Sequence, residues 1–179
     1  QGQTIKKPTF GRVFDIFLTT GDMSYKDYPI IYHVSQACHV DSILSDGAQG
    51  GLIPGGHGGE RIHVYGCGLH PDTDPSLITN DERMRAKAAS GKAVVAEAYK
   101  VKCTKDSIIW AIDNEMCQRK YGIIWKGTES FAAITSRKIP KQCLMSAIWW
   151  QADSVEYQRG PEAEHTHANY LWYEQKRAE

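Results

Sequence analysis

A stretch of the chain over residues 47–59 contains seven glycines and one proline. Glycine at this density disfavours both helix and strand, so a loop is expected to divide the chain here. A short apolar segment lies on either side, Ile30–Val34 before the loop and Arg61–Tyr65 after it. Each segment predicts a strand, and each carries one histidine, His33 and His63. A histidine on a rigid strand beside a loop is well placed to contact a ligand, and we interpret the loop as a mobile flap beside a cleft.

The remaining pattern predicts many short strands and few helices. Apolar residues at helical spacing predict a helix over 39–46 that is closed by Gly47, and good helix formers predict another over 81–89. Further strands are expected over 92–101, 108–112, 121–125, 130–135 and 147–150. This order favours an α+β fold with a mostly antiparallel core. We expect one domain over 30–150, an amino-terminal extension over 1–29 and a polar carboxy-terminal extension over 151–179.

Composition narrows the classes of partner and compartment. Lys plus Arg and Asp plus Glu both number 21, so no global charge recruits nucleic acid or an anionic membrane. The apolar runs are all far shorter than the roughly 20 residues that a bilayer span needs, and we expect no membrane partner. The five cysteines are odd in number, widely spaced and without a Cys-x-x-Cys motif. Free thiols in a reducing compartment, the cytoplasm or nucleus, are therefore expected.

Six motifs follow one another in an order that resembles the RNA 2′-phosphotransferase family. The family shows a strand ending in His-Gly-Thr, a helix reading Ile-x-x-x-Gly-Leu and a strand of the form Arg-x-His-Val-His. A small-residue helix, a Gly-Lys-x-Val-Val strand and a closing strand ending in Val-Pro follow. The counterparts here are His33-Val34-Ser35, Ile43 to Gly47 with Leu52, Arg61 to Tyr65, Ala86 to Ala89, Gly91 to Val95, and Ile134-Thr135 to Ile139-Pro140.

The resemblance implies an ADP-ribosyltransferase-like fold, with two small antiparallel sheets around a cleft that holds NAD. It also implies an enzyme that moves the 2′-phosphate of a spliced RNA junction onto NAD. The products are nicotinamide, an RNA with a 2′-hydroxyl and a cyclic phosphate of ADP-ribose. NAD would thus be a co-substrate, and RNA ends or a protein acceptor the second partner of what we expect to be a monomer.

The chain departs from the family pattern in three places. Val34 stands where the family has glycine, which would let the backbone approach the nicotinamide amide. The family also has an amino-terminal helical lobe with an essential arginine, whereas Arg12 is the one arginine before the first strand here. Glu129 follows Gly127 near the closing strand, where other ADP-ribosyltransferases place an acidic residue.

Candidate roles follow from the chemistry of breaking the bond between ribose C1 and nicotinamide. That step needs a positioned ribose and polar or negative groups near the developing cation. His33 could hydrogen-bond a ribose hydroxyl, and His63 could hold the diphosphate or the other ribose. Val34 and Ser35 adjoin His33 and belong to the same expected NAD-binding segment. Glu129 could orient the nucleophile or stabilise the ribose cation.

Two further pairs of residues complete the predicted site. Tyr65 shares a sheet face with His63 by the two-residue period of a strand and could stack on nicotinamide. Arg61 shares that face and suits a phosphate. Arg137 and Lys138 could contact an anionic acceptor. The alternative for each candidate residue is a purely structural role. Histidines in strands, half-buried tyrosines and basic residues at strand ends often have such roles.

Two other functions stay open on the sequence alone. One is an ADP-ribosyltransferase that modifies protein or nucleic acid, with Glu129 as its acidic residue. The other is a binding module on the same fold, in which Val34 blocks turnover. A zinc site built from Cys67, His70, His165 and His167 is not expected, because the two pairs lie far apart in the chain. The motif Gly-x-Ser-x-Gly of a serine hydrolase is absent from the sequence.

Overall fold

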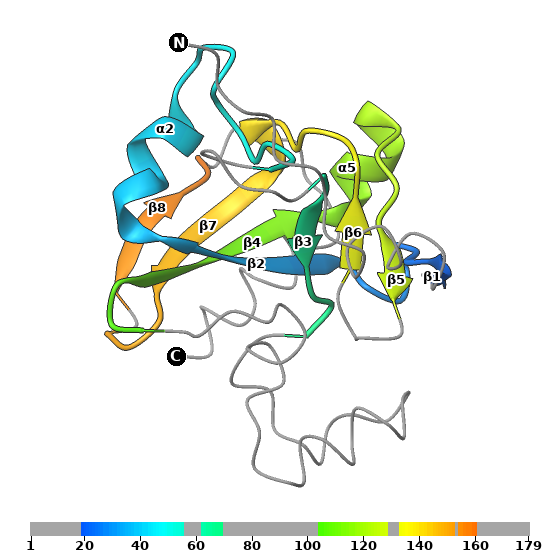
Figure 1. The fold of residues 1–179 in the computed structure, drawn as a ribbon, viewed down its shortest axis with the longest axis horizontal. Coiled ribbons are helices and arrows are strands. Elements are labelled where there is room, and N and C mark those ends of the chain that lie inside the picture. Colours follow the sequence, from blue (N-terminus) through cyan, green and yellow to red (C-terminus); the bar gives the residue numbers. More distant parts are fainter. Residues whose placement is uncertain (1–18, 56–61, 70–103, 129–132, 153, 161–179) are drawn as a thin grey trace, which may run out of the picture.

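In the part of the chain that the structure describes, two four-stranded antiparallel sheets and two short helices form an α+β protein (Figure 1). The computed structural model describes residues 19–55, 62–69, 104–128, 133–152 and 154–160. Among these residues, no helix has both the length and the apolar character that a membrane span requires. The predicted helix over 81–89 and the predicted strand over 92–101 lie outside the described residues.

The first sheet has the order β2-β4-β7-β8 and contributes more buried apolar residues to the core than the second sheet does. Its strands are β2 (Ile30–Gln36), β4 (Ser107–Asp113), β7 (Leu144–Trp149) and β8 (Val155–Gln158). Every residue of β4 is buried, as expected for a central strand covered on both faces. β2 pairs with β4 over its full length, which places His33 opposite Trp110.

The second sheet has the order β1-β5-β6-β3 and is built from shorter strands. These are β1 (Thr19–Asp22), β5 (Lys126–Thr128), β6 (Ala133–Thr135) and β3 (Val64–Gly66). Figure 1 shows β3 crossing β2, with β6 and then β5 next to β3 in the order of the second sheet.

The two sheets meet where β3 runs onto β2. Tyr32 and Cys67 exchange both backbone hydrogen bonds, at 2.7 and 2.9 Å. Gly66 lies so close to β2 that a Cβ atom there would be 2.6 Å from a side-chain methyl of Ile31. Only glycine allows this approach, and the close contact brings the end of β3 against the strand that carries His33.

Helix α5 (Asn114–Tyr121) follows directly from β4 and has well-defined ends. The Asp113 side chain accepts a hydrogen bond from the backbone N–H of Met116, the interaction of an N-cap. Gly122 ends the helix in the left-handed region at φ 63°, which glycine adopts without strain. The sequence pattern does not predict this helix and instead predicts a strand over 121–125. That prediction is wrong, because Tyr121 closes α5 and residues 122–125 form no strand.

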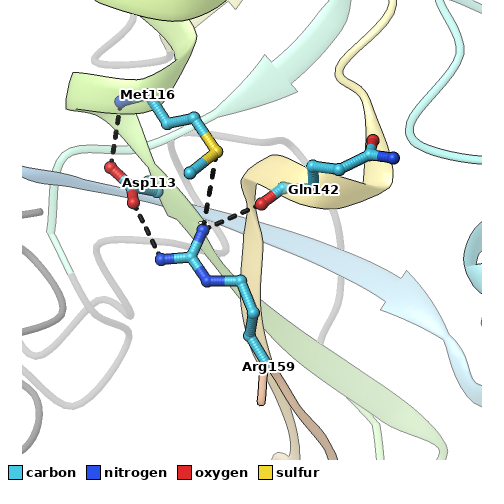
Figure 2. A network of polar contacts seen from close by, with 4 residues as sticks. All are labelled: Asp113, Met116, Gln142 and Arg159. Atoms are coloured by element: carbon cyan, nitrogen blue, oxygen red, sulfur yellow. Dashed lines mark hydrogen bonds and ion pairs between the residues drawn. The ribbon is translucent and has the colours of Figure 1, made fainter. Parts of the chain in front are cut away.

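An ion pair at the start of α5 ties three segments together (Figure 2). Arg159, just after β8, lies 2.9 Å from the Asp113 carboxylate, and its side chain is only 9% exposed. The same guanidinium donates a hydrogen bond to the carbonyl of Gln142 at 2.8 Å. Gln142 belongs to the turn η3 (Lys141–Cys143), so this network joins β4, η3 and the end of β8.

Several other predictions from the sequence can be compared with these elements. Strands are confirmed over 30–34, 108–112 and 147–149. The predicted strand over 61–65 is observed as Val64–Gly66, and the predicted strand over 130–135 as Ala133–Thr135. The helix predicted over 39–46 is a turn, η1 (Ala37–His39), followed by α2 (Val40–Leu44). Its C-cap is Ser45 and not Gly47, because Ser45 is already extended.

Two strands lie in the stretches that the sequence assigned to extensions. β1 precedes residue 30 and pairs with β5, while β8 follows residue 150 and pairs with β7. Both are edge strands of their sheets, and their residues are largely exposed. Edge strands with few buried residues leave a weak hydrophobic pattern, so the sequence gives little sign of them.

Candidate functional site

A cavity of about 260 Å³ lies beside the junction of the two sheets. One wall comes from β2, another from β3 and the residue before it, and a third from the loop that begins after α2. The residues that line it are His33, Val34, Ser35, His39, Ile43, Gln49, Gly51, Leu52, Ile53, Gly55, His63, Val64 and Tyr65. Five of these are residues that the sequence proposed as a site: His33, Val34, Ser35, His63 and Tyr65.

His33 is fixed by a hydrogen bond across the junction. Its Nδ1 lies 2.6 Å from the backbone carbonyl oxygen of Tyr65. A carbonyl can only accept, so Nδ1 carries the proton and donates. In the neutral ring Nε2 is then an acceptor, which suits a ligand hydroxyl. The bond therefore sets both the orientation and the tautomer of this histidine.

The rings of His63 and Tyr65 contact each other, although His63 precedes β3 and is not part of the second sheet. Their ring centroids are 6.2 Å apart, and the rings are nearly perpendicular at 81°. Both side chains are 7% exposed and thus almost enclosed by protein. This edge-to-face contact orients two polar aromatic groups that line the cavity.

Val34 and Ser35 also line the cavity, but each side chain has a structural role. Val34 is 8% exposed and packs in a cluster of buried residues with Tyr65, Cys67 and Ile109. Ser35 accepts a 2.8 Å hydrogen bond from the indole N–H of Trp110. The Ser35 hydroxyl proton is therefore directed away from Trp110, and the hydroxyl donates to the backbone carbonyl of Gln36 at 3.5 Å.

The described part of the glycine stretch, residues 47–55, is anchored by backbone hydrogen bonds. Gly51 donates to the carbonyl of Ile43 at 2.6 Å, and Leu52 exchanges two 2.9 Å bonds with Ile139. Gly51 adopts φ +79°, and a Cβ atom there would lie 2.2 Å from the Ile139 carbonyl oxygen. This part of the predicted flap is thus a fixed wall of the cavity, whereas residues 56–59 lie outside the described residues.

Basic residues after β6 bond to the segment 46–48, which leads into this wall. Lys138 donates to the carbonyl of Ala48 at 3.2 Å, and Lys141 pairs with Asp46. The hydrogen bond from Lys141 lowers the pKa of the exposed Asp46 carboxyl. Arg137 instead donates to the carbonyl of Gly122, at the end of α5.

The structure therefore brings some predicted residues together and leaves others apart. Arg137 and Lys138, proposed as acceptor contacts, do not line the cavity and bond to backbone carbonyls. Arg61 and Glu129 lie outside the described residues.

His39 was missed from the sequence. It belongs to η1, six residues beyond His33, and its half-buried side chain lines the cavity. The sequence gives little indication of this position, because the conformation of the turn after β2 decides where the His39 side chain lies. Gln49 was likewise hidden within the glycine stretch.

Two titratable groups at the junction, Cys67 and Tyr32, are largely buried. Burial raises the pKa of the Cys67 thiol to about 11, so this thiol stays protonated and unreactive near neutrality. Burial, followed by the nearby Cys67, also raises the pKa of Tyr32. Within the described parts of the chain, no three His, Cys, Asp or Glu side chains come together as metal ligands. His70, His165 and His167, considered above for zinc, are outside those parts.

No protein-family model matches this chain, and neither a curated protein nor a solved structure matches it.

Proposed function

We propose that the protein is an NAD-dependent transferase with an ADP-ribosyltransferase-like fold, closest in activity to the RNA 2′-phosphotransferases. The observation that carries the proposal is the position of the two histidines. His33 comes from β2 of one sheet and His63 directly precedes β3 of the other, and both line one cavity. The family resemblance rests on the same two segments of the sequence. The pair of antiparallel sheets beside a cavity supports it at the level of architecture.

The size of the cavity suits one part of NAD. Sites that enclose a whole small ligand usually measure about 300–1,000 Å³. A cavity of about 260 Å³ is therefore suited to nicotinamide and its ribose, with the rest of the dinucleotide outside it. The apolar lining residues Ile43, Leu52 and Val64 exclude water from such a ligand.

In the proposed reaction, the bond between ribose C1 and the nicotinamide nitrogen breaks, and nicotinamide leaves with the electron pair. An oxygen of the RNA 2′-phosphate forms the new bond to C1. The neighbouring ribose hydroxyl then attacks the phosphorus and closes the cyclic phosphate, while the bond from phosphorus to the RNA 2′ oxygen breaks and that oxygen takes up the hydroxyl proton. His33 would accept a hydrogen bond from a ribose hydroxyl at Nε2, held in register by its bond to the Tyr65 carbonyl. His63 and Tyr65 would contact the ring or the second polar group of NAD. These contacts position the ribose while positive charge develops on it.

The test is incubation with NAD and an oligonucleotide that carries an internal 2′-phosphate. We expect nicotinamide release that depends on this oligonucleotide and is absent with a matched 2′-hydroxyl oligonucleotide. If nicotinamide release is instead accompanied by attachment of ADP-ribose to protein or to unphosphorylated nucleic acid, the protein is an ADP-ribosyltransferase that modifies those acceptors, and the proposal is wrong. NAD binding without any release would leave a binding module, and absence of NAD binding at millimolar concentration would reject all three readings.

Val34→Gly tests whether the valine crowds the pocket at the position where the family has glycine. We expect tighter NAD binding or faster nicotinamide release, measured by calorimetry and product assay at a temperature where the variant is folded. The burial of Val34 makes the stability cost larger than strand propensity alone implies: about 3 kcal/mol from lost apolar contacts and added backbone freedom. Val34→Ala is the matched control, because it removes most of the side chain but keeps the backbone restricted. A glycine variant that is folded yet slower than wild type would show that Val34 is no obstacle.

A further inference from the structure

Two buried thiols lie next to each other beside the Arg159 network. Cys117 belongs to α5 and Cys143 to the turn η3, and both residues are fully buried in the same cluster of core residues. A hydrogen bond joins the two thiols. The strands β5 and β6 separate the two cysteines in the sequence, so the fold brings them together.

The guanidinium of Arg159 holds the two cysteine-bearing segments in this position (Figure 2). Its Nη1 lies 2.8 Å from the carbonyl oxygen of Gln142 and 3.7 Å from the sulfur of Met116. Gln142 directly precedes Cys143, and Met116 directly precedes Cys117. The closeness of the two segments is therefore fixed by these contacts as well as by the bond between the thiols.

The surroundings of the two thiols keep them reduced while the fold is closed. The hydrogen bond with Cys117, followed by burial, raises the pKa of the Cys143 thiol. Because the thiolate is the reactive form of cysteine, the pair should react much more slowly than the exposed Cys38. Its oxidation needs a local opening of the core that admits a small oxidant.

We propose that Cys117 and Cys143 form a redox-sensitive latch, which hydrogen peroxide closes as a disulfide that fastens α5 to η3. The sulfur of one cysteine attacks a peroxide oxygen and the O–O bond breaks. The hydroxide that leaves takes up the thiol proton as water, and a sulfenic acid remains. The second sulfur then attacks the sulfenic sulfur, the S–O bond breaks, and hydroxide again leaves with the thiol proton as water. The two sulfur atoms together lose the two electrons that the peroxide gains.

The closed latch should stabilise the fold. The disulfide would close a loop that contains β5 and β6, and such a cross-link restricts the unfolded chain. It would also join α5 and η3, which the Arg159 guanidinium already links. Neither cysteine is among the described residues that line the cavity, so the test of the latch does not depend on the transferase activity.

The experiment treats the folded chain with hydrogen peroxide, alkylates the remaining thiols in denaturant and analyses a tryptic digest by mass spectrometry. Cleavage after lysine and arginine places Cys117 in the peptide 106–119 and Cys143 in the peptide 142–159, each without another cysteine. We expect a disulfide between these two peptides, which dithiothreitol removes and which forms more slowly than Cys38 is oxidised. The thermal midpoint of the oxidised protein should lie about 5 °C or more above that of the reduced protein.

Three variants assign the effect to this pair. Cys38→Ser is the matched control, because it removes an exposed thiol and should keep both the cross-link and the rise in midpoint. Cys117→Ser and Cys143→Ser should lose both. The rise is measured within each variant, between peroxide-treated and dithiothreitol-treated samples, so the stability cost of the substitution itself cancels.

The outcomes in wild type and in Cys38→Ser decide the proposal even where a buried serine prevents folding. A disulfide between the peptides 106–119 and 142–159 together with a higher midpoint supports it. Alkylated Cys117 and Cys143 after peroxide treatment, or a disulfide of either with another cysteine in its place, would overturn it. A cross-link that leaves the midpoint unchanged or lowers it would also overturn it, because the disulfide would then not act as a latch.

Discussion

Replacement of Asp113 by alanine is expected to lower the free energy of unfolding by about 4 kcal/mol. Asp113 is fully buried, and its carboxylate both pairs with Arg159 and caps α5. Alanine would leave the guanidinium of Arg159 in a site that is only 9% exposed, without its counter-charge. Leaving one partner of a buried pair is more costly than losing both, because the remaining charge has been removed from water. Urea unfolding followed by circular dichroism measures the change.

Two further variants separate the causes of this loss. Asp113→Asn keeps an oxygen that can cap α5 but loses the charge, so its stability should lie between alanine and wild type. Glu115→Gln removes a pair with Arg119, whose side chain is 69% exposed, and should cost less than about 1 kcal/mol. If Asp113→Ala costs no more than Glu115→Gln, the buried network does not hold β4, η3 and the end of β8 together.

Replacement of His33 by asparagine is expected to reduce nicotinamide release by about 100-fold or more. An asparagine amide can donate to the Tyr65 carbonyl from nearly the position of the His33 Nδ1. It has no counterpart of Nε2, so the contact to the ribose hydroxyl is lost while the link between the sheets is kept. The stability of the variant should therefore stay near that of wild type.

The kinetic constants of two variants check this separation. In His33→Asn we expect kcat to fall with little change in the thermal midpoint. Lys138→Gln, which alters a predicted acceptor contact outside the cavity, should leave kcat close to wild type. An active and stable His33→Asn variant would show that Nε2 has no part in the reaction.

The parts of the fold that the sequence predicts are those with a strong burial pattern. β4 is a run of buried residues from Ser107 to Asp113, and such a run indicates a central strand. Helix α5 is different, because among its buried positions only Met116 and Cys117 are apolar in type, which leaves no broad stripe. Its start also coincides with the end of β4, where Asp113 ends the strand and caps the helix. A residue that ends one element and begins the next gives no separate boundary signal.

The candidate site divides in the same way. His33 and His63 could be predicted because each stands in a short apolar segment. The sequence pattern identifies both segments as strands and gives their order along the chain. His39 could not, since its approach to the cavity depends on the turn η1 between β2 and α2. Lys138 has the charge of a phosphate contact, yet its ammonium group bonds to the Ala48 carbonyl. Charge at a strand end identifies a candidate but does not reveal which way the side chain turns.

The most direct test of the function is NMR of the histidine rings during a titration with NAD. If NAD lies in the cavity, the ring signals of His33 and His63 should move together and saturate at one ligand concentration. The backbone amide of Lys120 on α5, outside the cavity, should stay unchanged and serves as the internal control. Histidine rings that do not respond to millimolar NAD, or changes confined to residues remote from the cavity, would contradict the assignment of this cavity as an NAD site.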